Sequence, residues 1–414
     1  MSMKVRALLS VGVVLSAMWL SSCGHYVCKT TFGSATCTPS GSGFSGGGGS
    51  NGAASAYAFA VNGNGTIDGY TLSATASTLT ATPNYTAATT AANAGGVGMV
   101  VAQGKYLYTV YADLHEIYGW TIDSSGGLTP IGGFPIPVSL TIPTLLAFNQ
   151  YAVITNPAGT LLFVSDAGIN QIIVYQINTS GALTQAPGSP FPAGSIEPQN
   201  MGMDGQGRYL YVSSEGSSLD HAGTVVGAFS VSSTGVLQQI SGSPFNYPLW
   251  QMQGDPSGSY LIGISGKTAY WYGSDDDSLY VFNINQSTGA ISPVAGSPFA
   301  TTYAPFNMAV RPSATGGEFV YTFSINDLGT AYNPIEGYQI STTSGTLSAL
   351  SLSTSTPTAW GQFDPAGSYL FSYSNSGSAI SLAALTVGST GGLTATGTPV
   401  TLNTGGYWAV SDVP

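Results

Sequence analysis

Short segments of aromatic and β-branched residues recur along the chain, and a turn that contains glycine introduces almost every one of them. They read GKYLYTV from Gly104, GTLLFVS from Gly159, GRYLYVS from Gly207, GSYLIGI from Gly258, GEFVYTF from Gly317 and GSYLFSY from Gly367. A seventh copy, AYAFAVN from Ala56, has no such turn. Such residues favour strands and glycine favours turns. The pattern predicts an all-β fold built from a repeated unit.

Each segment has strand-like neighbours on both sides. A variable loop follows it, and then an alternating strand with a polar hairpin, as in VFNINQSTGAISPV. A short strand such as NMGMD or NMAVR precedes it. The tetrapeptide Gly-Ser-Pro-Phe ends at Phe191, Phe245 and Phe299, so three successive units are spaced by 54 residues. Four strands per unit are typical of a propeller blade.

The first unit lacks its preceding strand, but the chain ends with YWAVSD, Tyr407 to Asp412, which fits that place. We therefore predict a seven-bladed β-propeller over residues 56–414. Its blades are four-stranded, and the C-terminal strand completes the first blade. No second globular domain is expected.

The N-terminal segment has the features of a secretion signal. Lys4 and Arg6 precede a mostly apolar stretch that is too short to span a bilayer comfortably. The quartet Leu20-Ser21-Ser22-Cys23 resembles a bacterial lipobox. That resemblance implies removal of residues 1–22 and acylation of Cys23, so that acyl chains anchor the protein to a membrane from outside the cytoplasm. The alternative is a plain signal peptide that ends near a cysteine.

Residues 23–55 are expected to connect this anchor to the propeller. The run TPSGSGFSGGGGSNGAAS, from Thr38 to Ser55, is typical of a flexible spacer. Cys28 and Cys37 remain once Cys23 carries lipid, and we expect them to form a local disulfide in an oxidising compartment. The predicted location is the cell envelope, facing the periplasm or the exterior.

Charge narrows the range of partners. The chain has 7 basic and 18 acidic residues, and removal of Lys4 and Arg6 would leave five basic residues and a net charge of −13. This balance argues against nucleic acid and anionic lipid headgroups as partners. Beyond the signal and tether, the basic residues are Lys105, Arg208, Lys267 and Arg311.

Ten of the 18 acids fall in the loops expected between the second and third strands of the blades, together with His115 and His221. They are Asp113, Glu116, Asp166, Glu215, Asp220, Asp275, Asp276, Asp277, Asp327 and Glu336. One face of the propeller would then be acidic and suited to a cation or a basic partner. The alternative is that charged residues occupy long exposed loops for their solubility.

These loops offer weak metal and acid-base candidates. Asp275 and Asp277, in SDDDS, supply oxygens of the kind that calcium binds, without the ligand spacing of an EF-hand loop. His221 and Glu215 are candidates for a metal or acid-base site, although no tight ligand motif surrounds them. We therefore predict no cofactor, with calcium as the alternative.

A ring of polar and aromatic residues emerges when the innermost strands are aligned. Because side chains alternate along a strand, one of two adjacent positions in each blade is expected to face the central channel near its mouth. Indole rings beside carboxamides suit sugars and other neutral polar rings, whereas the alternative is packing between blades. The predicted ligand-binding residues are Asn200, Gln251, Asn307, Trp250, Trp360 and Trp408.

The repeats resemble the seven-bladed lactonase family, which includes phosphogluconolactonase-type and carboxymuconate-cyclase-type propellers. In that family the matching segment commonly runs Gly-Pro-Arg-His, a short strand, His-Pro-Asp-Gly and a Tyr-rich strand that ends in Asn-Glu. Here Glu197-Pro198-Gln199-Asn200 takes the first place and Ser214-Glu215 the last. The resemblance implies a propeller fold and a lactonase site, but the arginine and histidine positions hold Gln199 and Asn200.

Two functions from different classes follow. Lactone opening needs an acid or base and a group that stabilises developing oxygen charge, and carboxamides neither exchange a proton near neutral pH nor supply positive charge. We therefore expect a non-catalytic lipoprotein that binds a neutral glycan, polymer or protein ligand. The alternative is a divergent lactone hydrolase that retains Glu215 and recruits His221 or a metal.

Overall fold

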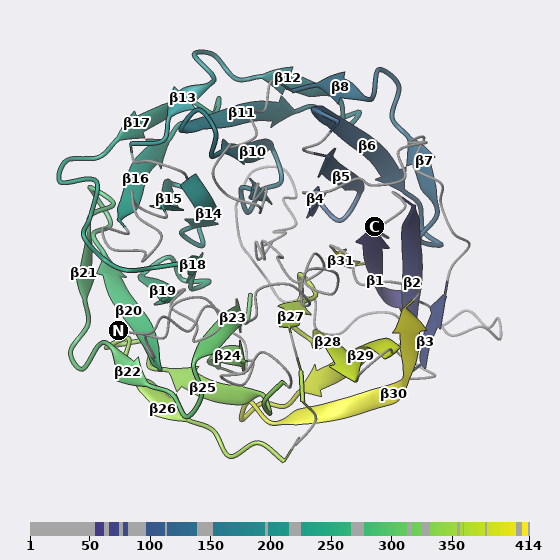
Figure 1. The fold of residues 1–414 in the computed structure, drawn as a ribbon, viewed down its shortest axis with the longest axis vertical. Helices are drawn as coiled ribbons and strands as arrows, with labels where there is room; N and C mark the ends of the chain where they lie inside the picture. Colours follow the sequence, from purple (N-terminus) through teal and green to yellow (C-terminus); the bar gives the residue numbers. More distant parts are fainter. Residues whose placement is uncertain are drawn as a thin grey trace, which may run out of the picture.

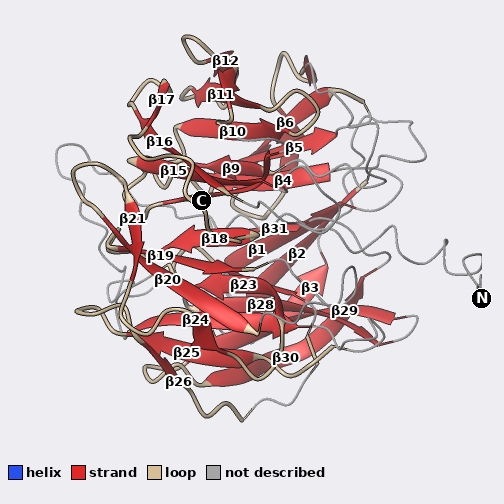
Figure 2. Cartoon of the chain, turned by 60° about the vertical axis from the view of Figure 1, so that its left-hand side comes forward, coloured by secondary structure: helices blue, strands red, loops and turns tan. Residues whose placement is uncertain are grey.

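The structure is a computed structural model of the chain. It describes residues 54–61, 66–73, 78–81, 97–111, 114–138, 152–194, 198–214, 225–265, 277–312, 317–324, 332–353, 357–358, 360–376, 379–402 and 408–412. Figure 2 shows strands and loops in this part of the chain and no helix. Accordingly, no described helix is long and apolar enough to span a membrane.

The described strands form seven antiparallel sheets in a ring, which confirms the predicted seven-bladed propeller (Figure 1). Blade 1 contains, from the channel outward, β31 (Trp408–Asp412), β1 (Ala54–Val61), β2 (Ile67–Ser73) and β3 (Thr78–Ala81). Blade 2 contains β4 (Val97–Ala102), β5 (Tyr106–Tyr111), β6 (Glu116–Ile122), β7 (Leu128–Pro130) and the short β8 (Ile136–Pro137). Blade 3 contains β9 (Val153–Thr155), β10 (Leu161–Asp166), β11 (Gln171–Ile177), β12 (Leu183–Gln185) and the short β13 (Phe191–Pro192).

The remaining four blades follow the same order. Blade 4 contains β14 (Pro198–Met203), β15 (Tyr209–Ser214), β16 (Val226–Val231) and β17 (Leu237–Gln239). Blade 5 contains β18 (Gln251–Gly254), β19 (Tyr260–Ile264), β20 (Ser278–Ile284), β21 (Ile291–Pro293) and the short β22 (Phe299–Ala300). Blade 6 contains β23 (Pro305–Val310), β24 (Glu318–Ser324), β25 (Glu336–Ile340) and β26 (Leu347–Ala349). Blade 7 contains β27 (Trp360–Phe363), β28 (Tyr369–Ser376), β29 (Ala379–Val387) and β30 (Leu393–Leu402).

The two ends of the propeller domain meet in blade 1. Strand β31 pairs with β1 in an antiparallel register that runs from Ala56 opposite Asp412 to Ala60 opposite Trp408. In Figure 1 β31 lies beside β1 on the channel side of the blade. The prediction that the C-terminal strand completes the first blade is therefore confirmed.

The Gly-Ser-Pro-Phe repeats end the blades rather than begin them. In each one the Ser-Pro peptide bond is cis, and the chain then turns back toward the third strand of its blade. The serine hydroxyl accepts a hydrogen bond from that strand, as Ser189 Oγ does from the Val174 amide at 2.8 Å. Phe191 lies opposite Ile172 in the same strand. The repeat is thus a closing turn that the third strand holds in place.

Tyrosines of the repeat fasten several blades to the next blade. Tyr211 on β15 is fully buried, and its hydroxyl donates to the carbonyl oxygen of Gly289, in the outer hairpin of blade 5, at 2.9 Å. Tyr108 and Tyr321 make the same bond to the following blade. Burial raises the pKa of Tyr211, so the hydroxyl stays a donor. The chain's many tyrosines therefore have a structural role in this ring.

We expect Tyr211→Phe to lower the free energy of unfolding by about 1 to 3 kcal/mol, because the buried Gly289 carbonyl would lose its donor. Urea unfolding followed by circular dichroism would measure this. Blade 3 carries phenylalanine at the matching position, Phe163, so the ring itself fits the site. An unchanged midpoint in the variant would contradict the fastening role.

The hydrophobic core is divided into layers between blades. Each of the seven clusters of buried residues combines side chains from two neighbouring blades, as Val320 of blade 6 does with Tyr260 and Ile262 of blade 5. A blade is therefore a sheet whose two faces pack against different neighbours. This arrangement decides where the side chains of the innermost strands point.

Candidate functional site

Two faces of the ring have different roles. We call loop face the side that carries the connections between the second and third strands and the links between blades. We call turn face the side that carries the turns between the first and second strands. Asp204, Asp255 and Asp364 close turns on the turn face, where their Oδ1 atoms accept backbone amides at 2.6 to 2.8 Å. These aspartates therefore act as turn formers that bond their own backbone.

The predicted ligand-binding residues lie on the innermost strands or just before them, toward the loop face. Trp250 immediately precedes β18, and its side chain is half-buried. The side chains of Asn200, Gln251, Asn307 and Trp360 are all buried. Trp408 begins β31, and its side chain lies outside the described part of the chain. Among the five of these residues whose side chains are described, Trp250 alone keeps substantial exposed surface.

Gln251 is directed at the neighbouring blade rather than at open space. Its Nε2 donates to the carbonyl oxygen of Met308 at 3.0 Å, and its Oε1 accepts the Met308 amide at 2.8 Å. Two residues later, Gln253 Oε1 accepts the Val310 amide at 2.6 Å. These carboxamides thus bond the inner edge of β23, which has no strand partner on its channel side. Ligand binding by Gln251 stays a prediction, and it would have to compete with these bonds.

Asn200 belongs to a similar connection between blades 4 and 5. Its backbone amide donates to Ser213 Oγ at 3.1 Å, and that hydroxyl donates to the carbonyl oxygen of Trp250 at 2.8 Å. Ser213 therefore links the inner strand of its own blade to the start of the next. This chain of bonds fixes the backbone beneath the Trp250 ring. Sequence reasoning missed Ser213 because nothing in GRYLYVS marks it as different from other strand serines.

Part of the predicted acidic loop set is described, and its best-placed member holds a link between blades. Glu336, the first residue of β25, accepts the Thr302 amide on Oε1 at 3.0 Å and the Tyr303 amide on Oε2 at 3.2 Å. The Tyr338 hydroxyl also donates to Glu336 Oε1 at 3.4 Å. The carboxylate therefore ties the segment between blades 5 and 6 to the loop face.

Glu116 has the corresponding place in blade 2. Its Oε2 accepts a hydrogen bond of 2.6 Å from Tyr118, whose ring stacks on Trp120 with 5.9 Å between ring centroids. Burial, and then the bond and charge of Glu116, raise the pKa of Tyr118. The signal that sequence reasoning missed is a Glu-x-Tyr pattern at the start of the third strand in both blades.

Several predicted residues lie outside the described residues, so their predictions stay open. They are Cys23, Cys28, Cys37, Asp113, Glu215, Asp220, His221, Lys267, Asp275, Asp276 and Asp327. Asp277 is described and half-buried, and its carbonyl oxygen accepts the Thr301 amide at 2.8 Å. Within the described ranges no three His, Cys, Asp or Glu side chains gather as a cation site.

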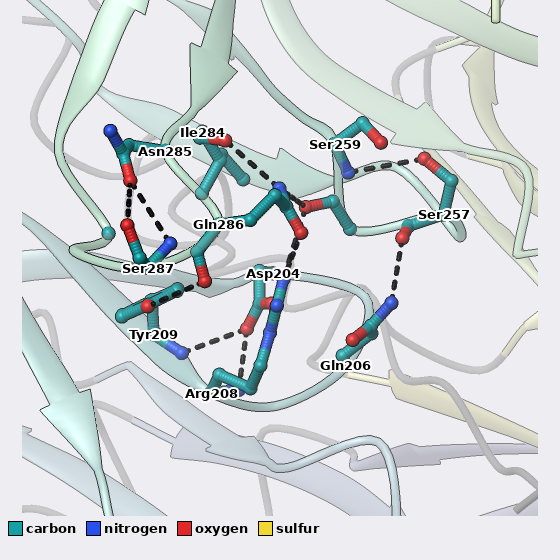
Figure 3. Close-up of polar contacts among 12 residues, drawn as sticks. Asp204, Gln206, Arg208, Tyr209, Ser257, Ser259, Ile284, Asn285, Gln286 and Ser287 are labelled. Carbon is teal, nitrogen blue, oxygen red and sulfur yellow. Dashed lines mark hydrogen bonds and ion pairs between the residues drawn. The ribbon is translucent and has the colours of Figure 1, made fainter.

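The described basic residues lie on the turn face, and two of them are bound into structural contacts there. Arg208 Nε pairs with Asp204 Oδ2 at 2.9 Å, and its Nη2 donates to Gln286 Oε1 at 2.8 Å (Figure 3). Arg311 is buried, and its Nε donates to the Gly367 carbonyl oxygen at 2.8 Å. Lys105 lies over the ring of Tyr106, 5.2 Å from its centroid. Each of these cations lies next to the turn-face end of a strand, away from the loop face.

Comparison with solved structures places this geometry among known propellers. A putative 6-phosphogluconolactonase from Bacteroides fragilis is 14% identical, with 87% of this chain and 98% of that chain covered and a TM-score of 0.60. The periplasmic gluconolactonase of Pseudomonas aeruginosa is 15% identical, with 87% and 100% covered and a TM-score of 0.53. A protein from Lactobacillus plantarum is 17% identical over the same shares, with a TM-score of 0.56. At these identities the likeness concerns the fold.

The sequence itself also matches a defined family. No curated protein matches this chain. The family described as "Lactonase, 7-bladed beta-propeller" matches residues 55–243 and 150–323, which together span more than half of the 414 residues. The chain therefore belongs to the lactonase family of seven-bladed β-propellers.

Proposed function

We propose that this protein is a membrane-anchored, extracytoplasmic propeller that binds a neutral polar ligand, such as a glycan, at its loop face. The observation that carries the proposal is the placement of positive charge. All three described basic residues lie on the turn face, and Arg208 and Arg311 already hold structural partners there. A net charge of −11 adds repulsion against anionic ligands. A phosphorylated lactone is therefore a poor fit, and a neutral ligand a better one.

The residues at the loop-face end of the channel suit recognition better than proton transfer. Trp250 offers an indole surface on a backbone that Ser213 holds in place. The position where the family resemblance puts histidine is Asn200, a side chain that does not titrate near neutral pH and that is buried. Binding of a sugar ring needs an apolar platform and a few directed hydrogen bonds. An indole ring and a carboxamide are groups of these two kinds, and neither has to transfer a proton to bind a ligand.

The proposal predicts that Trp250→Ala weakens binding of neutral oligosaccharides about tenfold or more, since truncating a central aromatic contact removes most of its platform. Trp250→Phe should retain part of the affinity, and Lys105→Ala, on the turn face, should retain all of it. A glycan array followed by calorimetry on the soluble fragment from Gly41 would measure these. Equal affinities in wild type and Trp250→Ala would show that the ligand does not bind against Trp250.

The second candidate is a divergent lactonase, favoured by the family match and by Glu215, which directly follows β15. A panel of sugar lactones with and without divalent metal, on wild type and Glu215→Gln, separates the two functions. We expect no turnover in either protein. Turnover that is lost in Glu215→Gln would refute the binding-only function.

A further inference from the structure

Glu318 points from blade 6 toward blade 5. On β24, Phe319 and Tyr321 pack in the layer shared with blade 7, whereas Val320 packs in the layer shared with blade 5. Side chains alternate along a strand, so Glu318 lies on the same side as Val320. Ile340, which is opposite Glu318 in register, also belongs to the layer shared with blade 5.

Burial of a carboxyl at this position is a feature of blade 6. Glu318 is only 2% exposed. The residues at the same place in blades 2, 3, 4, 5 and 7 are exposed or half-buried, and they are Lys105, Thr160, Arg208, Ser259 and Ser368. Glu318 Oε2 has no hydrogen-bond partner among the described residues. A buried carboxylate in such a place is costly, whereas a neutral carboxylic acid is much less so.

The acidic side chain whose charge acts on Glu318 is Asp255, which closes the turn of blade 5 and is fully buried. Its oxygens already accept hydrogen bonds from the Tyr260 and Ser257 amides. Burial, and then the charge of Asp255, raise the pKa of Glu318 to about 7. Burial also raises the pKa of Asp255, against the lowering effect of its hydrogen bonds.

The other titratable groups around this pair do not neutralise it. Tyr260 faces both carboxyls, and they add to burial in raising its pKa. Arg311, in the same blade, is directed at Gly367 of blade 7, and its charge acts on Tyr321 and Asp364. Arg208 reaches the turn that Asp255 closes, where its Nη2 donates to the Gly258 carbonyl oxygen at 3.4 Å, but its charge is paired with Asp204 in the one ion pair found among the described residues. The Asp255–Glu318 pair is therefore two facing acids without a described cation.

The remainder of the boundary between blades 5 and 6 is held by bonds that do not titrate near neutral pH. Gln251 and Gln253 bond the Met308 and Val310 backbone beside the channel. At the outer hairpin the Tyr260 ring lies so close that a Cβ on Gly345 would be 2.6 Å from it. At the turn face the carboxyl pair is thus the part of this boundary whose charge changes with pH, whereas the Glu336 carboxylate holds the link at the loop face.

We propose that the boundary between blades 5 and 6 is a pH-sensitive joint, which is closed while Glu318 carries a proton and loosens at the turn face when Glu318 and Asp255 are both charged. The sign follows from proton binding. The folded state holds the Glu318 proton up to a higher pH than the unfolded chain does, so its stabilising contribution is full below about pH 4.5. That contribution falls as pH rises and is lost above about pH 7.

The test is hydrogen exchange of the Met308 and Val310 amides at about pH 5.5 and about pH 8.5, corrected for the intrinsic rate of exchange. We expect the opening equilibrium of wild type to rise about thirtyfold at the higher pH, because about pH 5.5 lies about 1.5 units below the pKa of Glu318 and each unit corresponds to a factor of about ten. Glu318→Gln should be nearly independent of pH. Glu318→Ser, which installs the residue of blades 5 and 7, provides a second neutral variant if the first does not fold.

Glu116→Gln serves as a matched control, because it removes a carboxyl from the loop face of blade 2 and should keep the wild-type pH response. Urea midpoints of all four proteins at both pH values give an independent measure. A wild-type boundary that opens equally at both pH values would overturn the joint, as would neutral variants that respond like wild type.

Discussion

A chain that ends at Asn403 is expected to lose the cooperative folding of the propeller. Deleting the residues after it removes β31, whose pairing with β1 from Ala56 to Ala60 joins the two ends of the ring. Strand β1 would keep β2 on one side and present an open edge to the channel. About five paired residues at about 1 kcal/mol per hydrogen bond approach the whole stability of a typical domain, about 5 to 15 kcal/mol.

Urea unfolding of the truncated and full-length proteins measures this loss. Deletion of Val413 and Pro414 alone is the control, since both follow β31 and the pairing with β1 stays intact. Addition of a peptide that spans 404–414 to the truncated protein should restore part of the transition, because the open edge of β1 accepts an added strand. A truncated protein that unfolds at the full-length midpoint would show that the ring does not depend on this closure.

Most of the fold could be predicted because the pattern repeats. Strand composition and turn glycines are local features, and their seven copies specify both the structure of one blade and the number of blades. The position of YWAVSD at the end of the chain specifies how the ring closes. The family match to residues 55–323 confirms the same architecture. The signal segment, the lipidated Cys23 and the disulfide between Cys28 and Cys37 remain predictions, since they lie outside the described residues.

The candidate site was harder to predict because blades meet face to face. Alternation along a strand predicts that the Gln251 side chain points to the opposite face from those of the residues before and after it. It does not predict which residue of another blade that side chain contacts. Its partner, Met308, is 57 residues away in another blade, and only the ring geometry brings the two together. Glu336 and Glu318 illustrate the same limit, since one ties a link at the loop face and the other is buried at a boundary.

Glycines at the boundary between blades 4 and 5 have a role that no periodicity reveals. A Cβ at Gly202 on β14 would lie 2.3 Å from the carbonyl oxygen of Met252 on β18. On the other strand, a Cβ at Gly254 would lie 2.5 Å from the Met203 carbonyl oxygen. These are backbone atoms, so a rotamer change cannot relieve the contact. The inner strands of these two blades therefore approach each other as closely as they do because both positions lack a side chain.

Gly202→Ala is accordingly expected to lower the free energy of unfolding by roughly 3 kcal/mol, at the upper end of the usual cost of overpacking, because one inner strand has to move away from the other. Gly132→Ala adds the same methyl group where nothing lies within 4 Å, so its urea midpoint should stay near that of wild type. Hydrogen exchange of the β14 and β18 amides would locate the effect at this boundary. Equal midpoints for the two variants would mean that the close approach of β14 and β18 has room for a methyl group, and the glycines would then need another explanation.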